Sequence, residues 1–181
     1  MTPTDVMDQL DTDDDRCTTL VVTPWWEPEL ATSGVDPRDP YVERFWLPVL
    51  GPSTVLLLRR FARGFEEQPS GFRVGVRDTS LALGLGRGTG RNSPIMHTVD
   101  RAATFGLLRR ADEGRIAVRT HMPLLAPRHV RRLTPVLRRL HDDWVTSRER
   151  TPDPRRPAAP RPPRQARQAR QTGQARQSSQ D

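Results

Sequence analysis

Residues 72–119 read FRVGVRDTSLALGLGRGTGRNSPIMHTVDRAATFGLLRRADEGRIAVR, and this stretch decides the expected fold. Apolar side chains alternate with arginine and glycine over 72–77, a period of two that is typical of a short half-buried strand. A short helix is expected next, because Asp78 and Thr79 can cap it and apolar residues follow as far as Leu85. Glycine then occupies every second position from 84 to 90, which predicts a flexible turn.

The second half of the stretch predicts another helix and a hairpin. Ser93 can cap a helix and Pro94 suits its first position, while Gly106 is a natural end. Residues 107–110 and 115–119 flank a tight Asp-Glu-Gly turn, and apolar residues alternate in the second segment. This pattern predicts a β-hairpin.

Helices are expected on both sides of this stretch. A short helix is predicted to begin with Asp39 as its cap and to break at Pro48, and a longer amphipathic helix is predicted over 53–67. A last helical region begins near Pro127 and must kink or restart at Pro135, where Thr134 can act as a cap. The fold class expected from this order is α+β, mainly α.

The order helix, strand, helix, glycine-rich turn, helix and hairpin resembles the winged helix-turn-helix superfamily of DNA-binding proteins, and in particular a bacterial member of it. The resemblance covers residues 53–120 and extends to Trp144 if the C-terminal helix is included. It implies a short β-hairpin wing and a recognition helix over 93–105 that enters the major groove of double-stranded DNA. The turn before that helix is longer and richer in glycine than a typical helix-turn-helix turn, which leaves the angle between the two helices open.

Projecting the helix over 93–105 at 100° per residue separates two faces. Ile95, Val99, Ala102 and Ala103 gather on an apolar side, and His97, Asp100, Arg101 and Thr104 gather on the other. In the resemblance Arg101 would fork onto guanine, and His97 and Thr104 would bond bases or phosphates. The alternative is an ordinary solvated helix face.

Further contacts are expected at the start of this helix and from the wing. The wing tip carries Asp112 and Glu113, which phosphate would repel, so arginines on the wing strands are the expected contacts there. The full predicted DNA-binding set is Arg91, Asn92, Ser93, His97, Arg101, Thr104, Arg109, Arg110, Arg115 and Arg119.

All 29 basic residues are arginines, and the formal net charge is +7. Without lysine, a phosphate-loop lysine, a Schiff-base lysine and a kinase-type lysine are excluded. Guanidinium groups suit phosphate and guanine edges instead. No catalytic residues, metal ligands or cofactors are predicted: the glycine run, the aspartates at 11, 13 and 15, and the histidines all depart from the spacing of dinucleotide, calcium and zinc sites.

Charge and composition divide the chain into three expected parts. Residues 1–38 are expected to be an acidic, largely disordered arm, whose first 22 residues hold six aspartates and one arginine. Residues 39–146 are expected to form the winged-helix domain. Residues 147–181, rich in arginine, proline and glutamine, are expected to be a disordered tail. Trp25 and Trp26 are expected to pack onto the domain rather than bind a ligand.

The expected function is that of a small transcriptional regulator that binds double-stranded DNA. The expected location is the cytoplasm, at the nucleoid, because no signal sequence or apolar span occurs and Cys17 is the single cysteine. The alternative is a winged-helix module that docks a protein partner, including a second copy, without sequence-specific DNA binding. In that case the acidic arm could compete with DNA for the basic surface.

Overall fold

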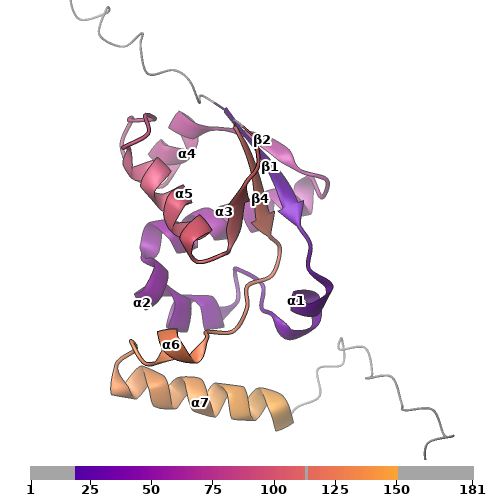
Figure 1. Ribbon diagram of the computed structural model, residues 1–181, viewed down its shortest axis with the longest axis vertical. Helices are drawn as coiled ribbons and strands as arrows, with labels where there is room; N and C mark the ends of the chain where they lie inside the picture. Colours follow the sequence, from indigo (N-terminus) through magenta and orange to yellow (C-terminus); the bar gives the residue numbers. More distant parts are fainter. Residues whose placement is uncertain (1–18, 113, 151–181) are drawn as a thin grey trace, which may run out of the picture. The chain divides into compact units, whose positions relative to one another are not determined.

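In the computed structural model, residues 19–112 and 114–150 are described, and one compact unit ends at Ser147. The last three residues of the final helix belong to a second unit with the tail. In chain order the elements are β1 (Thr19–Trp25), α1 (Pro28–Ser33), the π-helical turn η1 (Val42–Trp46), α2 (Leu47–Leu50), α3 (Pro52–Glu67), β2 (Phe72–Gly75), α4 (Val76–Ala82), α5 (Pro94–Thr104), β3 (Leu108–Arg110), β4 (Arg115–Arg119), α6 (Pro127–Val130) and α7 (Pro135–Arg150) (Figure 1). The fold is α+β, as predicted.

The sheet has four strands in the order β2-β1-β4-β3. Strand β1 pairs antiparallel with β2 and parallel with β4, and β3 and β4 form the predicted hairpin. The prediction of an irregular arm as far as residue 38 is therefore wrong from residue 19 onward. The run Thr19–Trp25 is too short for its period to stand out among nearby prolines, and its stability comes from pairing with two distant strands. The expectations for residues 1–18 and 151–181 lie outside the described residues.

One face of the sheet packs against the helices and forms the core. Leu20 and Val22 of β1 and Ile116 and Val118 of β4 are each at most 5% exposed. They alternate with partly exposed residues, because successive side chains of a strand point to opposite faces. Figure 1 shows α4 and α5 on one side of the sheet, and α5 contacts both α3 and β3. The core thus holds α5 against the hairpin.

The predicted helices are present, but α4 begins at Val76 with Gly75 as its N-cap and no side-chain cap. The prediction that the strand continues to residue 77 and that Asp78 and Thr79 cap this helix is therefore wrong.

Helix α3 spans Pro52–Glu67, one residue longer than expected, and α6 and α7 are separated before Pro135 as predicted. The Thr134 hydroxyl accepts a bond from the N–H of Leu137 at 3.4 Å, so it caps α7. Asp39 accepts from the N–H of Tyr41 at 2.7 Å, also as expected.

The prediction that Pro48 breaks the preceding helix is wrong, since helical structure continues through it to Leu50. The π-helical turn η1 lies immediately before it, and the N–H of Leu47 bonds the carbonyl of Val42, five residues back. Proline in a regular helix clashes with the carbonyl four residues earlier and removes a hydrogen bond. The wider turn ahead of Pro48 relieves this conflict.

The Tyr41 hydroxyl joins three segments of the core. It accepts a hydrogen bond from the N–H of Leu125 at 2.8 Å and lies 2.9 Å from Nε2 of His141. Because the hydroxyl oxygen accepts from the backbone, its proton is available for His141. Tyr41 is 1% exposed, and its ring packs against Phe45 and Trp144.

We predict that Tyr41→Phe lowers the free energy of unfolding by about 1–3 kcal/mol, because it leaves the buried N–H of Leu125 without its acceptor. Urea denaturation measures the change. The matched control is Ser33→Ala, which removes an exposed hydroxyl bond to Glu29 and should change stability far less. Equal stability of Tyr41→Phe and the wild type would contradict this account.

His129 gives the fold a dependence on pH. Its ring lies against Phe105 and Trp46, and burial, followed by repulsion from Arg128 and Arg132, lowers its pKa below the usual 6.5. The unfolded chain therefore binds this proton more readily, so the stabilisation is complete above pH 6.5 and declines as the pH falls below it. We predict that His129→Gln flattens the change in melting temperature between pH 8 and pH 5. An unchanged slope in this variant would contradict the assignment.

Candidate nucleic-acid interface

Helix α5 begins and ends at the residues that the sequence predicts. Ser93 is the N-cap, and its hydroxyl accepts from the N–H of Met96 at 3.5 Å; Pro94 occupies the first turn. The helix ends before Gly106, whose φ of 68° is in the left-handed region that glycine adopts without strain. No acidic residue lies in the first turn, so the positive end of the helix dipole is not neutralised by its own side chains.

The two faces of α5 are arranged as projected. Ile95 and Val99 are each 1% exposed and Ala102 is fully buried. The opposite side chains, His97, Asp100, Arg101 and Thr104, are exposed. The apolar side anchors the helix to α3 and the sheet, which leaves the polar side directed away from the core.

Several outward side chains also bond within the protein. The Thr104 hydroxyl donates to the carbonyl of Asp100 at 2.9 Å, and the Asp100 carboxylate accepts from Arg110 of β3 at 2.6 Å. Both side chains of this ion pair are about half exposed, and the pair neutralises Asp100, the carboxylate on the polar side of α5. Arg101 donates from one guanidinium nitrogen to the carbonyl of Val49 at 2.9 Å. Arg101 is therefore steered toward the junction of α2 and α3.

Arg91 and Asn92 lie exposed in the turn that leads into α5. This turn begins at Gly84 and Gly86, whose φ values of 69° and 84° favour glycine. The Ser80 hydroxyl of α4 donates to the carbonyl of Gly86 at 2.7 Å and ties the turn back to α4. The turn thus presents Arg91 beside the N-terminus of α5.

The hairpin divides the predicted arginines between two sides of the sheet. Arg109 pairs across the strands with Ala117, and Arg110 pairs with the buried Ile116. Residues directly opposite each other share a face, and neighbours along a strand lie on opposite faces. Arg110 therefore lies on the side of α5, where it meets Asp100, and Arg109 lies on the other side.

The same register places three further arginines with Arg109. Val21 pairs with both Arg73 and Arg115, and Trp25 pairs with Arg119. We call this surface the outer sheet face; it comprises Trp25, Arg73, Arg109, Arg115 and Arg119. The guanidinium carbons of Arg109 and Arg119 lie 3.5 and 4.2 Å from the Trp25 ring centroid, a cation–π arrangement.

Arg119 is the most constrained of these residues. Its side chain is 18% exposed and forms an ion pair of 2.9 Å with Glu27. The expected packing onto the domain is seen for Trp25, which lies against Arg109 and Arg119. It is wrong for Trp26, which is 60% exposed and makes a T-shaped ring contact with His121. The sequence did not indicate Trp25 or Arg73 as members of this surface, because their place depends on the tertiary pairing of β1.

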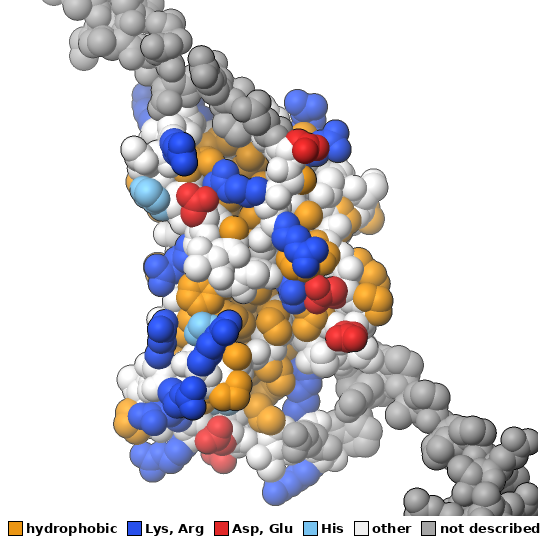
Figure 2. Space-filling view, in the orientation of Figure 1, with side chains coloured by type: hydrophobic (Ala, Val, Ile, Leu, Met, Phe, Trp, Pro, Cys, Tyr) orange, Lys and Arg blue, Asp and Glu red, His pale blue; other side chains and the backbone are white. Residues whose placement is uncertain are grey.

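The predicted set therefore separates into two surfaces. One surface consists of the predicted residues that lie at α5, and we call it the α5 face. Its residues are Arg91, Asn92, His97, Arg101, Thr104 and Arg110. Ser93 is 8% exposed and acts as the cap, so its side chain is committed to the helix. Figure 2 shows basic side chains spread over the visible face, with a few acidic ones between them.

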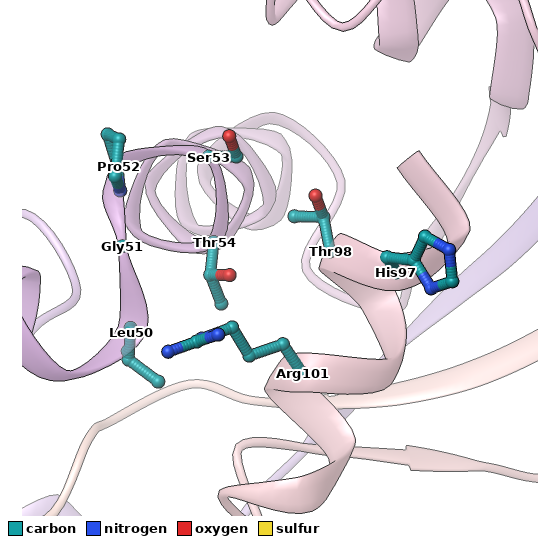
Figure 3. A pocket seen from close by; sticks show the side chains of 8 residues that line it. All are labelled: Leu50, Gly51, Pro52, Ser53, Thr54, His97, Thr98 and Arg101. Atoms are coloured by element: carbon teal, nitrogen blue, oxygen red, sulfur yellow. The ribbon is translucent and has the colours of Figure 1, made fainter. Parts of the chain in front are cut away.

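A pocket of about 330 Å³ opens between α5 and the N-terminus of α3 (Figure 3). It is lined by Leu50, Gly51, Pro52, Ser53, Thr54, His97, Thr98 and Arg101. The guanidinium of Arg101 reaches across from α5 toward Leu50, and Thr54 points from α3 into the space between the two helices. Two predicted DNA-binding residues, His97 and Arg101, therefore line this pocket together with the N-terminus of α3, which the sequence did not indicate.

Within the described ranges, no three histidine, cysteine, aspartate or glutamate side chains lie close enough together to hold a metal ion. Over the same residues, no helix is long and apolar enough to cross a membrane. The chain matches no known family model, and no similar curated protein or solved structure is found.

Proposed function

We propose that this protein is a winged-helix protein that binds double-stranded DNA, with α5 in the major groove, and that it acts as a transcriptional regulator. The observation that carries the proposal is the division of α5: its apolar residues are buried, while His97, Arg101 and Thr104 are exposed beside a β-hairpin. To insert into a groove, a helix must expose its polar side while its apolar side holds it to the core.

The arrangement of the surrounding elements supports this proposal. Helix α3, strand β2, helices α4 and α5 and the β3–β4 hairpin follow one another in the winged-helix order. Strand β1 is additional to that order and separates β2 from the hairpin. It widens the sheet on the side of β2 and leaves the contact between α5 and β3 in place.

The roles on the α5 face follow from the contacts. His97 and Thr104 would read base edges, and Arg91 and Asn92 would meet phosphate at the positive end of α5. Arg110 reaches this face and offsets the charge of Asp100, which removes a source of repulsion with DNA. The outer sheet face points away from α5, so Arg109, Arg115 and Arg119 are not assigned to a duplex held by α5.

A protein-docking module is the second interpretation, and it would need an exposed apolar groove. Among the described residues, the large apolar side chains with high exposure are Trp26, Leu56, Leu81, Val136 and Leu140. They come from α3, α4, α7 and the segment after β1, and only the last two are one helical turn apart. The composition of the α5 face favours a polyanion instead.

We predict that Arg91→Ala combined with Arg101→Ala weakens duplex binding by at least about ten-fold at low salt and reduces the slope of log affinity against log salt by about 1, since Arg91 makes one phosphate contact and each such contact contributes close to 0.9. Fluorescence anisotropy with a genomic fragment selected by the purified protein measures both quantities. The matched control is Arg60→Ala with Arg63→Ala, which removes the same charge from exposed positions of α3.

Two results would overturn the proposal. One is the absence of duplex binding by the wild type at low salt, and the other is an equal loss of affinity in the two double variants. The first outcome would favour the protein-docking interpretation. The second would mean that net charge alone, rather than the α5 face, determines binding.

We also predict that removal of residues 1–18 raises duplex affinity, because this segment contributes six aspartates and one arginine, a net charge of −5. The deletion must stop at residue 18, since β1 begins at Thr19 and a longer deletion would remove part of the sheet. The comparison uses anisotropy at low salt, where charge effects are largest. A variant with the six aspartates changed to asparagine separates charge from length, and unchanged affinity in both would exclude competition by the arm.

A further inference from the structure

We propose that the outer sheet face binds single-stranded nucleic acid. Its arginines hold the phosphodiester backbone, and an unpaired base stacks on the guanidinium of Arg109. This surface lies on the side of the sheet opposite α5, where Arg110 meets Asp100. The proposal therefore goes beyond the binding of a duplex by α5 and does not depend on it.

The charge of the outer sheet face is strongly positive. The strands β1, β2, β3 and β4 contain five arginines and no acidic residue, and four of these arginines lie on the outer face. Arg73, Arg109 and Arg115 are exposed, and within residues 19–112 and 114–150 they form no ion pair. Glu27 pairs with Arg119 instead. Three guanidinium groups are thus left to bind phosphate, which their planar set of donors suits.

Trp25 and Arg109 form a stack that is open at one end. The guanidinium carbon of Arg109 lies 3.5 Å from the centroid of the Trp25 ring, and the Arg109 side chain is exposed. One side of the planar guanidinium is therefore against the indole, while its other side is accessible. Unpaired bases stack on guanidinium planes and on aromatic rings, so a base on Arg109 would extend this stack.

The open stack favours a single strand of nucleic acid over other anionic partners. In a duplex the bases are stacked inside the helix and cannot reach Arg109. An acidic peptide would meet the same positive charge, but its carboxylates offer no ring to stack on a guanidinium. A partner that brings phosphates and unpaired bases together uses both features of the surface.

The arginines are spaced to contact more than one phosphate. Arg73 and Arg115 pair with the same residue of β1, Val21, on its two sides, so their Cα atoms lie about 10 Å apart. Arg119 is four residues beyond Arg115 on β4, a distance of about 13 Å. The exposed Asp112 of the wing tip lies beyond the strand ends and would repel phosphate there. A face of this size should hold about four nucleotides, the lower end of the range for sheet surfaces that bind single strands.

The test is fluorescence anisotropy of the full chain with a short labelled oligothymidylate at low salt. We expect saturable binding that Arg109→Lys weakens at least about five-fold, because lysine keeps the charge but has no plane on which a base can stack. Arg73→Ala with Arg115→Ala should lower the slope of log affinity against log salt by about 1.4, since each phosphate of a single strand contributes close to 0.7. These three side chains are exposed, so the variants keep the fold. The matched control is Arg60→Ala with Arg63→Ala on α3, which should leave the slope unchanged.

Competition and the α5 variants separate this proposal from its alternatives. Polyglutamate at the same concentration of charge should displace little of the oligothymidylate, and equal displacement would overturn the proposal in favour of an acidic peptide. Arg91→Ala with Arg101→Ala should keep most of its affinity for the oligothymidylate, and a loss like that of the duplex would place the single strand on the α5 face instead. The proposal also fails if the wild type shows no saturable binding, or if Arg109→Lys binds as tightly as the wild type. Binding of the oligothymidylate without any binding of a duplex would refute the proposed function and support this one.

Discussion

The pairing of β1 between β2 and β4 is the constraint on which the rest of the structure depends. Five residue pairs join β1 to β4 in parallel, and four join it to β2 in antiparallel. Without β1, the strand β2 and the hairpin would be two separate pieces with unpaired edges. The buried side chains of β1, Leu20 and Val22, lie under the helices, so the same strand that closes the sheet also completes the core.

This closure determines where the functional side chains lie. Because the register of β4 against β1 and β3 is set, Arg109 and Arg119 are held against the Trp25 ring, and Arg110 is turned to Asp100 of α5. A shift by one residue would exchange these roles, since the side-chain period of a strand is two. The charge of the α5 face and the stacking on the outer sheet face are therefore two results of one register.

Local pattern was enough to predict most of the helices and the hairpin. The ends of α5 follow from Ser93 and Gly106, and its two faces follow from the helical period of Ile95 and Val99. Strand β1 was missed because seven residues that include Pro24 carry little local signal and gain their stability from distant partners. The pocket was missed for a related reason: Thr54 lies on α3 and Arg101 on α5, and only the packing of the two helices brings them together.

The place of β1 also has a consequence for how the chain folds. The hydroxyl of Thr23 donates to the carbonyl of Ile116, 93 residues further along, and β1 is made before any of its partner strands. During synthesis the first strand must wait until the hairpin has left the ribosome, while α3 can form from local contacts alone. Closing so long a loop is slow compared with helix formation. The sheet should therefore be assembled last, around helices that already exist.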